Sequence, residues 1–166
     1  QKTAYEIVSR DWSSDVCSSD LNNLKIKNLA SEVLHLKKTK FSKFKISLKK
    51  KFKIQKSEHY GWKFSDIYIE KKHKIKWISN SIRLRNNFDF NPKNDFVIIP
   101  EIWAHFAEEM LIKKNIKYAI FVQNGYAMNS TSDQKKLFNC YKKADFILSY
   151  SKDISECIKT VFNIDK

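Results

Sequence analysis

Polar side chains follow three short apolar runs in the second half of this sequence, at the points where each run ends. Glu101 comes directly after residues 95–100, and Ser149 and Ser151 close or follow residues 145–149. The run between them, residues 117–123, leads into a polar group made of Gln123, Asn124, Gly125 and Tyr126. In open parallel sheets, ligands bind outside the carboxyl ends of the strands. We therefore expect all three polar groups to face one crevice.

Each of these residues also has a local structural interpretation. Glu101 would suit the start of a helix as a negative charge, and Ser151 would suit the N-cap of another helix. Asn124 and Gly125 form a dipeptide that is typical of turns. Both the functional and the local interpretation stay open for these positions.

Other patterns of catalytic residues are not visible. His105 precedes Glu108 and Glu109 in HFAEE, but the second histidine that a helix-borne zinc site needs is missing. The four histidines are scattered, at His35, His59, His73 and His105. Only two glycines are present, which excludes a phosphate-binding loop, and there is no serine nucleophile elbow. We therefore expect no metal, no cofactor and no catalytic residue in this chain.

The elements that must position the polar groups alternate along the chain. Two short apolar runs are typical of buried strands of a parallel sheet, namely residues 95–100 and 117–123, and residues 145–149 predict a third short strand. Three segments with apolar residues at helical spacing follow these runs, at residues 101–115, 134–144 and 152–162. In the last segment Ile154, Ile158 and Val161 are expected to form the buried face. This alternation predicts the α/β class, with a Rossmann-like parallel sheet and helices on both faces.

The first half of the chain is less regular. Residues 33–37 predict a further strand, but residues 37–54 mix Lys and Phe without a clean period. Such a segment suits single-stranded nucleic acid, an anionic lipid surface, or a basic helix or strand pair with buried phenylalanines. The net charge of +14 favours an anionic partner, although the Lys-rich codon usage of an AT-rich genome would produce the same excess.

Residues 1–21 differ in composition from the rest of the chain. QKTAYEI and DWSSDVCSSDL can be back-translated, in the right order and frame, into the two ends of a common short-read sequencing adapter. They match neither a signal peptide nor a transit peptide. We expect residues 1–21 to be a non-native leader without fixed structure, and residues 22–166 to be one truncated domain. Because the leader carries two basic and four acidic residues, removing it raises the net charge from +14 to +16.

The sequence also indicates a compartment. Cys140 and Cys157 lie outside the leader, and no secretory signal is visible, which favours reduced thiols in the cytoplasm. No apolar run approaches the length of about 18 residues that a membrane-spanning helix requires. We expect a cytoplasmic protein whose contact with an anionic membrane, if it has one, is peripheral and on the inner face.

The strand-end motifs resemble those of a known enzyme group. DFVIIPEIW, KYAIFVQNGY and YKKADFILSYSKDISECIK look like the latter part of the N-terminal Rossmann-like domain of a GT-B glycosyltransferase of the large retaining group (family 4 type). The resemblance covers residues 95–166 well and residues 22–94 weakly. In that family the N-terminal domain mainly binds the acceptor, and a C-terminal domain binds the nucleotide-sugar donor.

This resemblance implies a positioning role for Asn124 near the transferred sugar, helped by Glu101 and Tyr126. The residues expected to line the acceptor cleft are Glu101, Gln123, Asn124, Gly125, Tyr126, Ser149 and Ser151. The implied partners are a glycan or lipid-linked acceptor and a C-terminal donor domain. The glycine loop after the first strand and the paired glutamates of the donor domain are missing from this sequence, so we expect the fragment alone to be inactive. The alternative hypothesis is a basic α/β module that binds nucleic acid.

Overall fold

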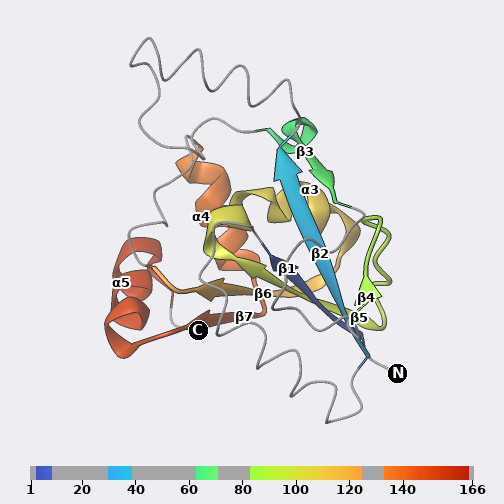
Figure 1. Ribbon diagram of the computed structural model, residues 1–166. Helices are drawn as coiled ribbons and strands as arrows, with labels where there is room; N and C mark the ends of the chain where they lie inside the picture. The colour runs from blue at the N-terminus through green and yellow to red at the C-terminus, as the bar shows by residue number, and fades with distance from the viewer. Residues whose placement is uncertain (1–2, 9–29, 39–62, 71–82, 125–132, 165–166) are drawn as a thin grey trace.

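The computed structural model describes residues 3–8, 30–38, 63–70, 83–124 and 133–164. These residues form one sheet with helices packed against it (Figure 1). The strands are mostly parallel and are interleaved with helices in chain order, so the predicted α/β class is confirmed. Residues 39–62, which contain most of the Lys- and Phe-rich segment, lie outside the described residues.

The sheet has seven strands in the order β3-β2-β1-β5-β6-β7, and β4 also pairs with β2. The strands are β1 (Thr3–Val8), β2 (Ala30–Lys38), β3 (Ile67–Ile69), β4 (Arg83–Leu84), β5 (Asp95–Pro100), β6 (Lys117–Val122) and β7 (Phe146–Ser149). Every pair is parallel except β2 with β3. Because β4 pairs with the first half of β2 and β3 with its last residues, these two strands share the outer edge of β2.

The parallel strands alone have the order of a doubly wound, Rossmann-like sheet. Across the sheet they run β4-β2-β1-β5-β6-β7, which is the 3-2-1-4-5-6 order of that fold when they are renumbered along the chain. The strand order reverses between β1 and β5, which pair from Thr3 with Asp95 to Glu6 with Ile98. Ligands of such sheets bind at the carboxyl edge beside this reversal.

Strand β1 differs from what the sequence predicts for the leader. We expect no fixed structure for residues 1–21, whereas Thr3–Val8 form a strand at the centre of the sheet. The physical reason is backbone pairing, because a strand between β2 and β5 satisfies its N–H and C=O groups on both sides whatever side chains it carries. The origin of residues 1–21 stays a prediction, and residues 9–21 lie outside the described residues.

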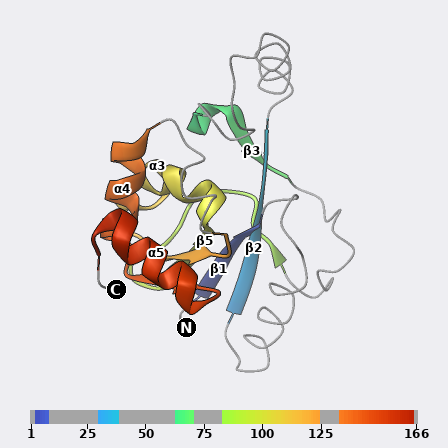
Figure 2. The same ribbon diagram turned by 90° about the vertical axis from the view of Figure 1, so that its left-hand side faces the viewer.

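The described helices pack on one face of the sheet (Figure 2). They are η1 (Phe64–Asp66), η2 (Glu101–Phe106), α3 (Ala107–Met110), η3 (Ile112–Lys114), α4 (Gln134–Lys143) and α5 (Lys152–Phe162). On this face Val97 and Ile99 of β5 and Ile120 and Val122 of β6 are buried in the same core cluster as the helices. The helices expected on the opposite face stay a prediction, because residues 9–29 and 39–62 lie outside the described residues.

Residues 101–115 form three short helical pieces instead of the single helix that their spacing predicts. Ile102, Phe106 and Met110, which lie at helical spacing in this segment, are all buried. All six residues of η2 are buried, including Glu101 and His105, so this piece has no solvent-exposed face. Contacts with the sheet on one side and with α4 on the other therefore set its backbone, and a short, tight 3₁₀ turn fits between them.

Helices α4 and α5 agree with the predicted segments, and the structure corrects one detail of their packing. Ser151 caps α5, because its Oγ accepts a hydrogen bond from the N–H of Ile154 at 3.3 Å. The buried face of α5 is made by Ile158 and Phe162, whereas Val161 is 47% exposed. A spacing of four residues keeps Ile158 and Phe162 on one stripe, and Val161 falls beside it.

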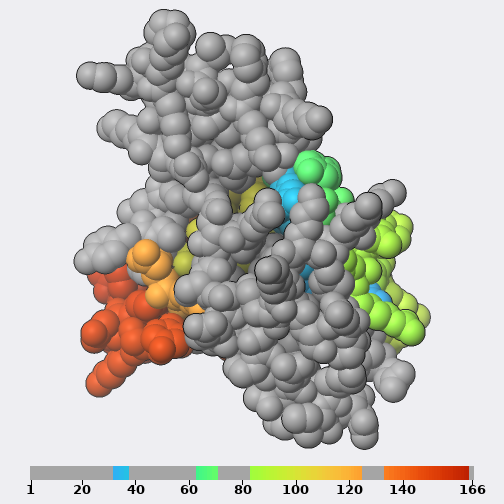
Figure 3. Space-filling view, in the orientation of Figure 1, coloured from blue at the N-terminus to red at the C-terminus, as the bar shows by residue number. Residues whose placement is uncertain are grey.

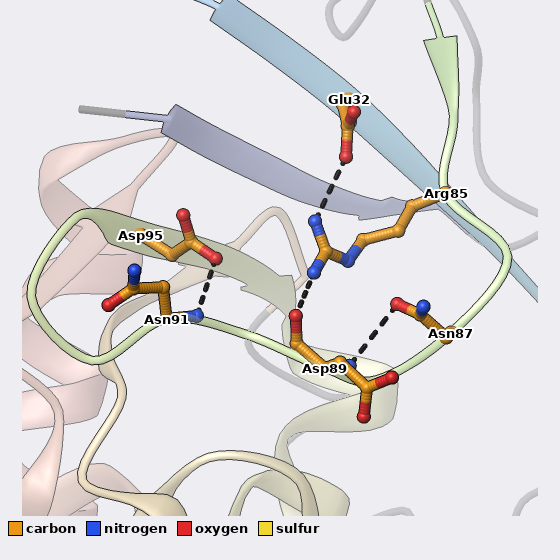
Figure 4. Close-up of polar contacts among 6 residues, drawn as sticks. All are labelled: Glu32, Arg85, Asn87, Asp89, Asn91 and Asp95. Carbon is orange, nitrogen blue, oxygen red and sulfur yellow. Dashed lines mark hydrogen bonds and ion pairs between the residues drawn. The ribbon is translucent and has the colours of Figure 1, made fainter. Parts of the chain in front are cut away.

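A polar cluster holds the loop between β4 and β5 at the opposite, amino edge of the sheet (Figure 4). Arg85 donates a hydrogen bond to Glu32 of β2 at 3.0 Å and another to the carbonyl oxygen of Asp89. The N–H of Asn91 donates to the Asp95 carboxylate at 2.7 Å, just where β5 begins. These contacts tie one end of the loop to β2 and the other end to the start of β5.

Candidate functional site

Three parallel strands end side by side at the carboxyl edge of the sheet. Pro100 at the end of β5 lies opposite Phe121 of β6, and Val122 at the end of β6 lies opposite Ser149 of β7. The N–H of Tyr150 then donates to the carbonyl oxygen of Val122 at 3.1 Å. The segments that follow these three strands therefore begin at one edge.

Glu101 is the first residue beyond β5, and its carboxylate joins two of these segments. The extended backbone of Pro100 ends the strand and caps η2, which turns the Glu101 side chain inward. Oε1 accepts a hydrogen bond from the N–H of Asn124 at 3.2 Å. The backbone N–H groups of Gln123 and of Glu101 itself also favour the charged carboxylate. Glu101 thereby fixes the backbone that follows β6, although it lies 23 residues earlier in the chain.

Burial dominates the electrostatics of this carboxyl group. Glu101 is only 2% exposed. The loss of hydration raises its pKa above the ordinary value of 4.5, and the three backbone N–H groups only partly offset this effect. The second oxygen, Oε2, is buried and has no hydrogen-bond partner among the described residues. Burying a carboxylate with only one hydrogen-bonded oxygen costs folding free energy. Carboxyl groups whose pKa is raised by burial are common at functional sites.

Tyr141 of α4 is a neighbour of Glu101 that the sequence does not reveal. Its hydroxyl is also buried and has no hydrogen-bond partner within the described part of the chain. Burial is the main reason that the pKa of this phenol is raised, and the charge of Glu101 raises it further. Sequence spacing predicts only that Tyr141 faces the core. A separation of 40 positions between the two residues leaves no local signal that could pair them.

Asn124 and Gln123 present the accessible polar groups of this edge. Gln123 is half-buried, and Asn124 is exposed while its backbone is held by Glu101. The structure therefore brings Glu101, Gln123 and Asn124 together. Gly125 and Tyr126, which the sequence places in the same cleft, lie outside the described residues.

The serines after β7 have a more local role. Ser151 is exposed and its Oγ serves as the helix cap described above, which agrees with its structural interpretation. Ser149 is half-buried at the end of β7, opposite Val122. Ser149 thus ends β7, the strand next to β6, and Ser151 lies two residues beyond it as the N-cap of α5.

The two cysteines of the C-terminal helices are expected to differ strongly in reactivity. Cys140 on α4 is buried, and burial is the main cause that raises the pKa of its thiol to about 12. Cys157 on α5 is exposed. Because the thiolate is the reactive form, we expect iodoacetamide at neutral pH to modify Cys140 at least about 100-fold more slowly than Cys157.

Peptide-resolved mass spectrometry of the native protein measures the two rates separately. Repeating the reaction in urea provides the control, because unfolding should make the two rates similar. Equal rates in the native protein would contradict the burial of Cys140.

The described residues contain no group of three or more His, Cys, Asp or Glu side chains that could hold a metal ion. None of the described helices has both the length and the apolar character that a membrane crossing requires. No family model, curated protein or solved structure matches this chain.

Proposed function

We propose that this chain is the acceptor-binding, Rossmann-like domain of a GT-B glycosyltransferase, and that the acceptor binds at the carboxyl edge of β5, β6 and β7. The observation that carries the proposal is the link between Glu101 and the backbone of Asn124. A buried carboxylate with only one hydrogen-bonded oxygen lies at the strand-end position where ligands of doubly wound sheets bind. The resemblance of the strand-end motifs provides the enzyme class.

In this proposal Asn124 and Glu101 have different roles. Asn124 is exposed, and its side-chain amide can both donate to and accept from the hydroxyl groups of a glycan or lipid-linked acceptor. Glu101 is a positioning residue, because it is buried and acts by holding the N–H of Asn124. The separate donor domain would supply the nucleotide-sugar.

The proposal predicts that glycan binding depends on Asn124. We expect Asn124→Ala to weaken the binding of an oligosaccharide to this chain by about tenfold, which corresponds to the loss of one or two hydrogen bonds. The measurement is an NMR or calorimetric titration with oligosaccharides that score in a glycan array.

Asn94→Ala is the matched control for this prediction. Asn94 is an exposed asparagine at the opposite edge of the sheet, directly before β5, and its replacement should leave binding unchanged. Unchanged binding by Asn124→Ala, or no glycan bound by the unmodified chain, would remove the proposed site. Sequencing the complete gene tests the enzyme class separately, since the proposal requires a second Rossmann-like domain with paired glutamates.

The net charge of +14 favours a second candidate, a module that binds nucleic acid. The Lys- and Phe-rich segment at residues 37–54 that motivates it lies almost entirely outside the described residues. Titration with a single-stranded oligonucleotide distinguishes the two functions. Nucleic-acid binding should weaken steeply with salt and should not respond to Asn124→Ala.

A further inference from the structure

Exposed lysines gather at the amino edge of the sheet, where β5, β6 and β7 begin. These strands are parallel to one another, so the segments that lead into them, residues 91–95, 112–117 and 142–145, meet at this edge. The exposed lysines of these segments, which we call the amino-edge lysines, are Lys93, Lys113, Lys114, Lys117, Lys142 and Lys143. The same segments contain two acidic residues, Asp95 and Asp145, and each of them accepts a backbone N–H. Positive charge therefore exceeds negative charge at this edge.

Helix ends explain only part of this gathering. Lys113 and Lys114 lie in the last turn of η3. Lys142 and Lys143 lie in the last turn of α4. A positive charge is favourable at these places because the carbonyl end of a helix is negative. Lys117 lies within β6, however, so a helix end does not account for it.

An exposed aromatic ring lies on the same part of the sheet as Lys117. Phe146, the first residue of β7, is 59% exposed, and its ring centroid lies 6.1 Å from that of Phe96 on β5. Phe96 is in register with Lys117, and Phe146 with Ala119, so these four side chains share one face of the sheet. Because the alternate residues of these strands pack in the core with the helices, this face is opposite the described helices. In the space-filling view the C-terminal part of the chain, coloured orange to red, lies at the surface (Figure 3).

The chemistry of this surface favours single-stranded nucleic acid over a membrane. An exposed ring offers a flat apolar surface to an unpaired base, and nearby lysines attract the phosphates. Lysine lacks the planar fork of arginine, so the surface would bind phosphate without reading sequence. Asp145 is exposed directly beside Phe146 and would have to enter an anionic lipid surface together with the ring. On a nucleic acid, by contrast, a carboxylate can accept a hydrogen bond from the amino group of a base.

We propose that Phe96, Phe146 and the amino-edge lysines bind single-stranded nucleic acid. One base stacks on Phe146, its neighbour contacts Phe96, and the phosphates that flank them meet Lys117 and the other lysines. The proposal goes beyond the proposed function and does not depend on it, because this edge of the sheet is opposite the candidate acceptor site. It also differs from the interpretation of the sequence that assigns nucleic acid to residues 37–54.

The first test removes the exposed ring. Fluorescence anisotropy of a labelled oligothymidylate of about 15 nucleotides measures binding to the full chain at low salt. Phe146→Ala should weaken this binding by at least about fivefold, because the stacked base loses its platform. Tyr68→Ala is the matched control, since Tyr68 is an exposed aromatic residue on β3, at the other end of the sheet, and its replacement should leave binding unchanged. Circular dichroism verifies that each variant is folded.

The second test removes charge and keeps the ring. The double variant Lys117→Gln and Lys143→Gln should reduce the dependence of log affinity on log salt concentration by about 1.4, which is about 0.7 for each lost phosphate contact. The matched control is Lys135→Gln with Lys152→Gln. It removes the same charge from exposed lysines at the starts of α4 and α5, beyond the carboxyl edge, and should change the salt dependence by less than about 0.5.

Three results would overturn the proposal. The first is a chain that does not bind oligothymidylate at low salt. The second is binding that either Phe146→Ala or the double variant of Lys117 and Lys143 leaves unchanged, which would assign nucleic acid to another surface. The third is binding to vesicles of anionic phospholipid that Phe146→Ala abolishes, without binding of the oligonucleotide, which would assign this surface to a membrane.

Discussion

Replacing Tyr141 with alanine is expected to lower the free energy of unfolding by about 3–5 kcal/mol, the largest effect of any single change considered. Tyr141 is fully buried on α4. Its ring lies parallel to that of Phe162 on α5, with a centroid separation of 4.0 Å and an angle of 8°. The alanine variant would lose this contact and leave a cavity where α4, α5 and the sheet meet. Because the free energy of unfolding of a small domain is about 5–15 kcal/mol, such a loss is a large fraction of its stability.

Urea denaturation followed by circular dichroism measures this loss, and Tyr141→Phe is its matched control. The phenylalanine variant keeps the ring and removes only a hydroxyl group that has no hydrogen-bond partner among the described residues. Its free energy of unfolding should therefore lie within about 1 kcal/mol of that of the original chain, or be slightly higher. If Tyr141→Phe cost as much as Tyr141→Ala, the hydroxyl would have a partner and the ring contact would not be the cause.

Glu101→Gln is expected to stabilise the protein at neutral pH by about 1–3 kcal/mol, because the change removes a desolvated charge and leaves only a neutral amide group in its place. Glutamine retains an oxygen that can accept the N–H of Asn124 and carries no charge. The pKa of Glu101 is raised in the folded state by burial, so the neutral acid is the form that the fold prefers. Its contribution to stability is fully present below the ordinary pKa of 4.5 and is lost as the pH rises through the raised value.

The gain in stability from Glu101→Gln should therefore grow as the pH increases from about 4 to about 8, since only the original chain must bury a charge at the higher pH. Urea denaturation at several pH values measures this difference. Glu108→Gln, on the neighbouring helix α3, is the control for exchanging a half-buried carboxylate for an amide. An advantage that does not change with pH would show that the Glu101 charge is not the cause.

A residue that lowers stability in its natural form and improves it when neutralised is typical of a functional position. This is the link between the stability prediction and the proposed acceptor site. If Glu101→Gln is more stable and Asn124→Ala still loses glycan binding, both effects agree with a site that the protein maintains at a cost.

Local pattern was sufficient for most elements in the second half of the chain. The apolar runs at residues 95–100, 117–123 and 145–149 are strands within one residue of the predicted bounds. Short apolar runs that are ended by Pro, Gly or polar residues are typical of strands. Strands β5 and β6 are largely buried, whereas β7 exposes Phe146 and Leu148. Ser151 was predictable as a cap for a similar reason, because capping depends on residues three positions apart.

The buried face of the last helix and the form of residues 101–115 were not predictable in the same way. Val161 and Phe162 are both apolar, and only the position of α4 decides that Phe162 is buried against Tyr141. Residues 101–115 have helical spacing, but contacts on both sides of η2 divide the segment into shorter pieces. In both cases the competing factor is packing between elements, which a single periodicity does not contain.

By itself, the sequence determined the α/β class, the strands that end in polar residues and the common edge on which Glu101 and Asn124 lie, because parallel strands share the direction of their ends. Only the tertiary structure decided that the Glu101 carboxylate bonds to the backbone of Asn124 and lies near Tyr141. It also decided that Thr3–Val8 fill the centre of the sheet and that β7 exposes Phe146 and Leu148. These features depend on residues far apart in the chain, whose proximity is set by how strands pair and helices pack and not by the local order of side chains.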